Sequence, residues 1–172
     1  SGWDLEVIVY DAFMDAEDIK AAGCTPVDKE TLFKESDFIS INLRLVEATK
    51  NWADEKHLNM MKKTAYIVNT GRSGLIDTNA LLTALKEKRI AGAGLDVFDQ
   101  EPLEAGNPWV ELDNVTLTTH IAGTTTEVLT GSPYLLMEDM ERFLKGEKAN
   151  FIMNPEVLEN PEFKAWLEEV KK

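Results

Sequence analysis

Residues 65–97 read AYIVNTGRSGLIDTNALLTALKEKRIAGAGLDV, and they decide the fold class. Short runs of β-branched and small residues at 65–69 and 91–97 predict two strands. Between these runs, Asp77 has the position of a helix N-cap, and the leucines that follow it recur at helical spacing. The glycines of the second run allow another element to approach closely. A strand, a helix and a second strand in this order predict a βαβ unit with parallel strands.

The same alternation continues on both sides of this unit. Further strands are predicted at residues 6–10, 25–27, 38–42 and 114–119. Helices are predicted at 15–22, from Asp28 onward, at 55–61, at 124–145 and after Asn154-Pro155. Gly131-Ser-Pro133 predicts a kink in the longest of them, because a proline inside a helix removes a hydrogen bond. Strands that alternate with helices are typical of an α/β fold built on a parallel sheet.

The composition limits the classes of function. The chain has 172 residues, enough for one globular domain with an appended helix, and 18 basic against 31 acidic side chains give a net charge of −13. Because such a charge repels phosphate groups, we expect neither a nucleic-acid partner nor a membrane partner. The single cysteine, Cys24, cannot form an internal disulfide, and no apolar run is long enough to cross a bilayer, so we expect a cytoplasmic protein. Cys24 is either a reactive thiol or a small apolar filler, and we assign it no role.

Several polar residues come directly after predicted strands, which is where ligands bind in open α/β sheets. Asp11 follows the strand at 6–10. An acidic side chain there either accepts hydrogen bonds from an adenosine ribose or forms a turn. Arg72 follows the strand at 65–69 and lies between two glycines. Its guanidinium either holds a carboxylate through two parallel hydrogen bonds or is a surface cation.

Three ordered motifs carry a resemblance to a known family. They are Val68-Asn-Thr-Gly-Arg-Ser-Gly-Leu-Ile-Asp77, Gly92-Ala-Gly-Leu-Asp-Val-Phe-Asp-Gln-Glu-Pro102 and Leu117-Thr-Thr-His-Ile-Ala-Gly123. Together they resemble the D-isomer-specific 2-hydroxyacid dehydrogenases, a family that includes phosphoglycerate dehydrogenase, and the similarity runs from about Val7 to Pro155. The resemblance implies a Rossmann-type doubly wound parallel sheet and NAD as cofactor. It also implies hydride transfer between NAD(H) and a D-2-hydroxy acid/2-oxo acid pair.

The resemblance further implies roles for individual residues. Arg72 would bind the substrate carboxylate, His120 would be the acid/base, and Glu101 would orient and charge the histidine. The cofactor contacts would be Asp11 and Leu43 on the adenosine side, Asp96 at the carboxamide, and Thr70, Gly71, Arg72, His120, Ile121, Ala122 and Gly123 around the nicotinamide and its ribose. Taken singly, His120 could be a core histidine, Glu101 a loop carboxylate and Asp96 a turn residue. Their joint order at strand ends favours the site. His57 lies in no such motif and is predicted at the surface. No metal site is assigned.

Two features depart from the family pattern. Asn42-Leu-Arg-Leu45 stands in place of the more common His-x-Pro-Leu on the adenine side. No Gly-x-Gly-x-x-Gly turn precedes Asp11, and the strand before such a turn belongs at the centre of the sheet, between residues 6–10 and 38–42. We therefore expect a sheet that lacks its first strand and has two unpaired strand edges. We also expect a fragment that is inactive by itself and needs the missing N-terminal part of the same enzyme.

The expected organisation is a partial NAD(P)-binding domain at 1–153 and a C-terminal helical segment at 154–172 that packs back on the missing substrate domain. The resemblance also implies a homodimer. The main alternative is a non-catalytic NADH-sensing or protein-binding module on the same fold. The joint presence of Arg72, Glu101 and His120 argues against it, because a binding role needs no acid/base. A third possibility is a part that a second polypeptide complements.

Overall fold

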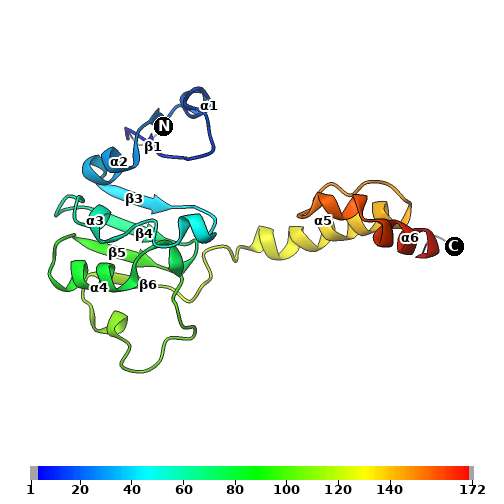
Figure 1. Ribbon diagram of the computed structural model, residues 1–172. Coiled ribbons are helices and arrows are strands. Elements are labelled where there is room, and N and C mark those ends of the chain that lie inside the picture. The colour runs from blue at the N-terminus through cyan, green and yellow to red at the C-terminus, as the bar shows by residue number, and fades with distance from the viewer. Residues whose placement is uncertain (1–3, 171–172) are drawn as a thin grey trace. The chain divides into compact units, whose positions relative to one another are not determined.

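The computed structural model describes residues 4–170 (Figure 1). The chain divides into two compact units, of which the first ends at Ala122 and the second begins at Gly123. The domain boundary predicted between residues 153 and 154 falls inside the second unit. The long helix predicted at 124–145 is therefore part of the second compact unit, and its assignment to the cofactor domain stays a prediction.

The first unit is built on a parallel sheet of four strands in the order β3-β4-β5-β6. The strands are β3 (Phe38–Ile41), β4 (Tyr66–Asn69), β5 (Gly92–Leu95) and β6 (Val115–Leu117). Their last residues, which lie side by side across the sheet, are Ile41, Asn69, Leu95 and Leu117. The carboxyl ends of the strands are therefore level at one edge, and the predicted parallel α/β sheet is confirmed.

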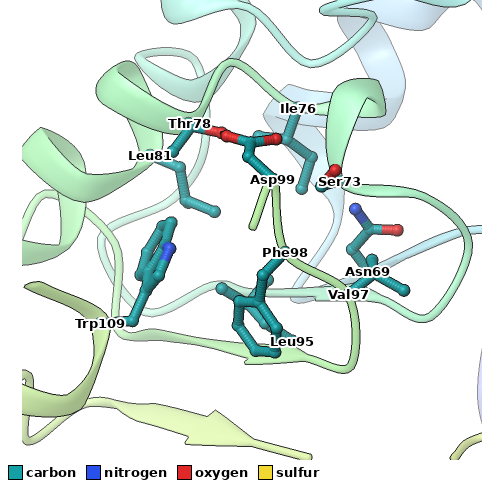
Figure 2. Close-up of a pocket in the computed structure, with 10 residues that line it drawn as sticks. All are labelled: Asn69, Ser73, Ile76, Thr78, Leu81, Leu95, Val97, Phe98, Asp99 and Trp109. Atoms are coloured by element: carbon teal, nitrogen blue, oxygen red, sulfur yellow. The ribbon is translucent and has the colours of Figure 1, made fainter. Parts of the chain in front are cut away.

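Helices cover one face of this sheet. They are α2 (Lys29–Glu35), α3 (Glu55–Leu58) and α4 (Thr78–Lys86), and the 3₁₀ helices of the first unit are η1 (Glu47–Thr49), η2 (Ser73–Leu75) and η3 (Pro108–Glu111). Neighbouring strand residues point to opposite faces, so in β3 Ile39 and Ile41 are buried under the helices while Phe38 is 73% exposed. Figure 2 shows Leu81 of α4 beside Trp109 at the edge of the same core. The apolar core thus lies between this face and the helices.

A second, smaller sheet lies in the N-terminal part of the first unit. β1 (Ile8–Val9) pairs in parallel with β2 (Thr25–Pro26), and α1 (Ala16–Ala21) connects them. Both strands are shorter than the runs predicted at 6–10 and 25–27. Among the described residues, β1 pairs with β2 alone and β3 with β4 alone. β1 and β3 are thus each at an edge of their sheet, and the strand expected between them stays a prediction.

Strand β5 is packed too closely for a side chain at its first residue. A Cβ on Gly92 would lie 2.6 Å from the carbonyl oxygen of Asn114 and 2.9 Å from the ring of Tyr66. The Tyr66 ring in turn stacks on Phe38, with ring centroids 5.5 Å apart. The predicted close approach at this glycine-rich strand is confirmed.

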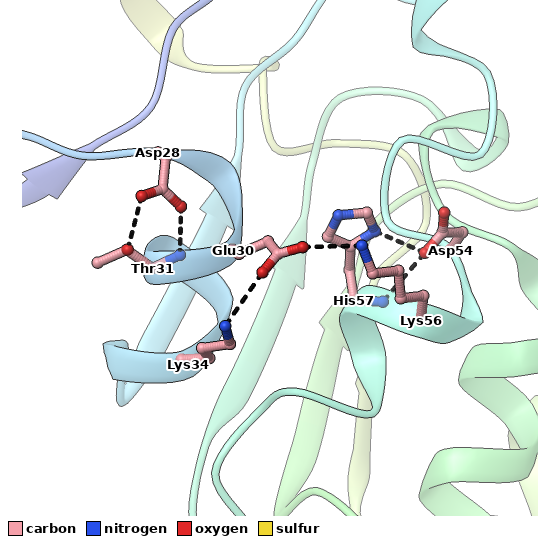
Figure 3. Close-up of polar contacts among 7 residues, drawn as sticks. All are labelled: Asp28, Glu30, Thr31, Lys34, Asp54, Lys56 and His57. Carbon is pink, nitrogen blue, oxygen red and sulfur yellow. Dashed lines mark hydrogen bonds and ion pairs between the residues drawn. The ribbon is translucent and has the colours of Figure 1, made fainter.

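The prediction that His57 lies at the surface is wrong. His57 is 9% exposed in α3, and its ring centroid lies 5.2 Å from that of Phe33. Asp54, the N-cap of α3, accepts a hydrogen bond from the His57 amide, and its Oδ1 lies 2.6 Å from Nδ1 of the ring (Figure 3). Because the Asp54 carboxylate provides a hydrogen-bond partner for Nδ1 of the imidazole, the ring can be buried against the core. Burial raises the pKa of Asp54, but the hydrogen bonds from His57 outweigh burial and leave this pKa below its ordinary value.

Ion pairs on the surface join α2 to α3. Glu30 of α2 contacts Lys56 of α3 at 2.8 Å and Lys34 of its own helix at 3.1 Å (Figure 3). Asp28 accepts a hydrogen bond from the Thr31 amide at 2.8 Å, so the predicted helix start at Asp28 is confirmed.

The second unit is helical. Its helices are α5 (Thr126–Leu144), η4 (Pro155–Glu159) and α6 (Pro161–Val170). α5 continues through Pro133 without interruption, and the kink stays a prediction. The ring centroid of Phe143 lies 6.1 Å from those of both Phe163 and Trp166, so aromatic contacts hold α5 against α6. Across residues 4–170, no helix combines the length and the apolar character that a membrane span requires.

Candidate active site

The predicted site residues lie where the parallel strands end. Leu43 follows β3, residues 70–72 follow β4, Asp96 follows β5, and His120 follows β6. Because the ends of these four strands are level, the loops that carry the residues share one edge of the main sheet. Asp11 has the equivalent position after β1 of the smaller sheet.

His120 and Glu101 form the central contact at this edge. Nδ1 of His120 lies 2.8 Å from Oε2 of Glu101, and the side chains are 46% and 36% exposed. The other carboxylate oxygen, Oε1, accepts a hydrogen bond from the Phe98 amide at 2.8 Å. The hydrogen bond with His120, followed in size by the one from Phe98, holds the pKa of Glu101 below its ordinary value. Because a carboxylate only accepts, Nδ1 is the donor and Nε2 stays available to a substrate.

Asp96 anchors the loop that presents His120. Its side chain is 2% exposed and accepts hydrogen bonds from Oγ1 of Thr118 at 2.5 Å and from the amides of Ile121 and Ala122 at 2.9 Å. Burial raises the pKa of Asp96, but the bond from Thr118 and the two amide bonds outweigh burial and leave it lowered. Between these bonded residues, His120 has a left-handed φ of 58°, which costs energy in a residue with a Cβ. The anchored carboxylate compensates for that strain.

Asn69 shapes the loop that carries Arg72. Its buried side chain donates to the Arg72 carbonyl at 2.8 Å and accepts from the Gly71 amide at 3.0 Å. Arg72 is exposed, and its guanidinium donates back to the Gly71 carbonyl at 2.7 Å. Within the described residues, Arg72 makes no hydrogen bond or ion pair with Glu101 or His120. The structure therefore brings Glu101, His120 and Asp96 into one network and places Arg72 on a neighbouring loop of the same edge.

The remaining predicted cofactor residues have mixed surroundings. Asp11 accepts hydrogen bonds from the amides of Phe13 and Met14 through Oδ1, so it does form a turn. Leu43 is partly buried against the main core. The exposed residues are Thr70, Ile121 and Ala122, and Gly71 is partly buried. Gly123 is the first residue of the second unit.

Two positioning residues were missed by reading the sequence. Asn69 was assigned only to a strand, and Thr118 only to the segment that delivers His120. Asn69 is the last residue of β4 and Thr118 directly follows β6, and this position of a polar residue at a strand end was the signal available for both. Their partners follow from loop geometry, which the pattern of residue types does not contain.

The comparison with protein families decides the identity of this fold. Residues 1–122 match the family described as the D-isomer specific 2-hydroxyacid dehydrogenase, NAD binding domain. The chain belongs to this family. The matched residues include the edge that carries Asp96, Glu101 and His120, and the resemblance seen in the three sequence motifs is confirmed.

Individual relatives in the 2-hydroxyacid dehydrogenase family agree. A glyoxylate reductase of Thermococcus litoralis is 41% identical over 157 residues, which cover 91% of this chain and 47% of that protein. A D-3-phosphoglycerate dehydrogenase of Synechocystis sp. is 37% identical over 160 residues, which cover 90% of this chain and 29% of that protein. The crystal structure of D-lactate dehydrogenase with NAD+ from Lactobacillus jensenii superposes with a TM-score of 0.78 at 28% identity, covering 86% of this chain and 48% of the other. The chain thus spans about half the length of the first curated relatives it matches.

Proposed function

We propose that this chain supplies the catalytic and cofactor-binding residues of an oxidoreductase that interconverts a D-2-hydroxy acid and its 2-oxo acid with NAD(H). The contact between His120 Nδ1 and Glu101 Oε2 carries the proposal. Oxidation of a secondary alcohol by loss of hydride also releases the hydroxyl proton, and reduction of the oxo acid requires its return. A positioned imidazole serves both directions, because imidazoles exchange protons near neutral pH.

In this proposal each group of the pair has a distinct task. Glu101 accepts from Nδ1 and so fixes the proton of the neutral ring on that atom. Nε2 of His120 is then the atom that takes the proton from the substrate hydroxyl and returns it. When His120 is protonated, the carboxylate of Glu101 stabilises the positive charge.

Arg72 is proposed to bind the substrate carboxylate. Its exposed guanidinium uses Nη1 for the Gly71 carbonyl and retains further donors in its planar fork. Asn69 holds the backbone from which Arg72 extends, so the guanidinium is positioned by a buried residue. A bidentate clamp would orient the substrate relative to His120.

The residues at this edge fit the nicotinamide half of NAD. Thr70 contributes an exposed hydroxyl beside Gly71, and Asp96 Oδ2 accepts a single hydrogen bond within the described residues, which leaves it room for a carboxamide donor. Asp11 Oδ2 accepts no hydrogen bond in the same part of the chain and is available to a ribose hydroxyl. When bound, NAD(H) supplies the hydride chemistry of the reaction.

The test is a set of three variants in the gene product that contains this chain. We expect His120→Gln to lower kcat for NADH-dependent reduction of a 2-oxo acid panel by about 10²- to 10⁴-fold, the usual contribution of a positioned acid/base. Glu101→Gln should lower kcat less. Glu104→Gln is the matched control, because Glu104 lies on the same loop but contacts Gln100 instead of the histidine. Full turnover by the His120 variant, or NADH binding with no turnover of any acid by the unmodified protein, would refute the proposal.

We further propose a cytoplasmic homodimer as the working form. The single cysteine, which forms no disulfide, and the family membership support this proposal. Light scattering after size-exclusion chromatography would measure the mass, and a monomer at micromolar concentration would contradict the dimer.

A further inference from the structure

The turn after β5, residues 99–101, contacts the rest of the first unit through two side chains. At one point Oε2 of Glu101 contacts Nδ1 of His120 at 2.8 Å. At the other, two residues earlier, Oδ2 of Asp99 accepts a hydrogen bond from Oγ1 of Thr78 at 2.6 Å. In the described part of the chain, the other side-chain hydrogen bonds of residues 99–101 stay within four residues, whereas these two reach residues about 20 positions away. The second tie has no part in the proposed chemistry, yet it fixes the backbone next to Glu101.

Thr78 offers a rigid anchor for this tie. It is the first residue of α4, directly after the N-cap Asp77, whose side chain accepts from the Ala80 amide at 3.0 Å. One turn further along, α4 buries Leu81 in the main core. Figure 2 shows the Thr78 and Asp99 side chains meeting above that leucine. The hydroxyl donor is therefore held by an element that is itself fixed by packing.

Glu101 needs such support because its contact with the histidine is exposed. The side chains of His120 and Glu101 are 46% and 36% accessible to water. Exposed ion pairs contribute little by themselves, because water screens the charges and both side chains lose rotational freedom. The hydrogen bond from the Phe98 amide to Glu101 closes the turn on itself but does not reach another element. The bond between Thr78 and Asp99 does, and its short length is typical of a charge-assisted hydrogen bond.

We propose that Asp99, held by Thr78, is a positioning residue that sets the orientation of Glu101 and, through it, the tautomer of His120. The bond at Asp99 restricts the turn so that Glu101 Oε2 stays within reach of Nδ1. The ring then carries its proton on Nδ1 and keeps Nε2 free. The inference rests on the proposed function only where it gives Nε2 a role in the reaction. The contacts from Thr78 to Asp99 and from Glu101 to His120 do not depend on that role.

The test measures the tautomer of His120 directly, by ¹⁵N NMR of the imidazole nitrogens at a pH where the ring is neutral. The chain has two histidines, so the spectrum is simple. His57 is an internal control, because its Nδ1 lies 2.6 Å from Asp54, the N-cap of α3, and not from a residue of the turn after β5. Thr78→Val removes the donor and keeps the shape of the side chain, while Thr78→Ser keeps the donor. Glu101→Gln marks the limit without a carboxylate.

We expect Thr78→Val to move the His120 tautomer ratio about twofold to fivefold from Nδ1–H toward Nε2–H, the range that loss of an exposed ion pair allows. Thr78→Ser should match the unmodified chain, and His57 should not change in any variant. Asp99→Asn, which keeps an oxygen acceptor without the charge, should give a smaller shift in the same direction and remains informative if Thr78→Val does not fold.

Three results would overturn the inference. In the first, Thr78→Val lowers the unfolding temperature but leaves the tautomer unchanged, which assigns the bond a purely structural role. In the second, Thr78→Ser shifts the ratio as far as Thr78→Val. In the third, Thr78→Val and Asp99→Asn both leave the ratio unchanged while Glu101→Gln shifts it. An inactive enzyme with the expected tautomer shifts would refute the proposed function and keep the positioning by Asp99, so the two failures are distinguishable.

Discussion

Replacing Asp96 by asparagine should destabilise the first unit strongly for so small a change. The carboxylate accepts from Thr118 and the Ile121 amide through Oδ1 and from the Ala122 amide through Oδ2. An asparagine has one acceptor oxygen, so in either orientation its NH₂ group faces at least one of these donors. The lost bond involves a charged and buried acceptor, and such bonds contribute about 1.5–3 kcal/mol. We therefore expect Asp96→Asn to lower the free energy of unfolding by about 2 kcal/mol.

Urea unfolding at neutral pH measures this loss. With a slope of about 1–3 kcal/mol per molar urea, the midpoint should fall by about 1 M without a change of slope. Asp113→Asn is the matched control, because Asp113 pairs with Lys88 at 3.3 Å on a side chain that is 77% exposed. An exposed pair of this kind contributes about 0–1 kcal/mol, so the control midpoint should move little.

Acid adds a second readout for Asp96. Its folded-state pKa is below the unfolded value, so its contribution is fully present above the unfolded pKa of about 3.9 and is lost as the pH falls through the folded pKa. The stability difference between the unmodified chain and Asp96→Asn should therefore shrink below about pH 4. Equal midpoints for Asp96→Asn and Asp113→Asn, or a difference that persists unchanged to lower pH, would show that the carboxylate does not hold the His120 loop.

Two further measurements test the packing of the sheet and the cofactor site. Gly92→Ala should lower the free energy of unfolding by about 1–3 kcal/mol, because its Cβ would lie 2.6 Å from a backbone oxygen. Gly131→Ala is the control: this helical position has open space around it, so the alanine should stabilise α5 by about 0.5–1 kcal/mol. Equal effects of the two variants in thermal unfolding would contradict this account of β5. Calorimetric titration of the 172-residue chain with NADH should show weak binding or none, because its sequence contains no Gly-x-Gly-x-x-Gly turn to receive the pyrophosphate, and tight binding would contradict the expectation.

The features that sequence could predict are those with a local signal. Alternating apolar runs predict the strands, and the order of the motifs around Arg72, Glu101 and His120 indicates the family. The separation of β1-β2 from the main sheet agrees with the expectation that β1 and β3 are not neighbours, and the strand expected between them stays a prediction.

The features that sequence could not predict depend on partners far along the chain. Thr118 and the amides of Ile121 and Ala122 lie 22 to 26 residues from Asp96, and Thr78 lies 21 residues from Asp99. No periodic pattern encodes such contacts. His57 is different, because its partner is only three residues away. An aspartate N-cap followed three residues later by histidine is a local signal, and it identifies a ring that can be satisfied while it is buried.

Asp96 and Glu101 are two carboxylates at the same edge of the main sheet, and their environments differ. Asp96 is almost wholly buried, and three donors from its own chain keep it ionised, so it is suited to fixing a strained backbone and unsuited to exchanging protons. Glu101 is partly exposed, and its hydrogen bond with the imidazole of His120 holds its pKa below the ordinary value. In the proposed reaction, Asp96 would keep the His120 loop in place, and Glu101 would stabilise the imidazole while Nε2 takes up the proton.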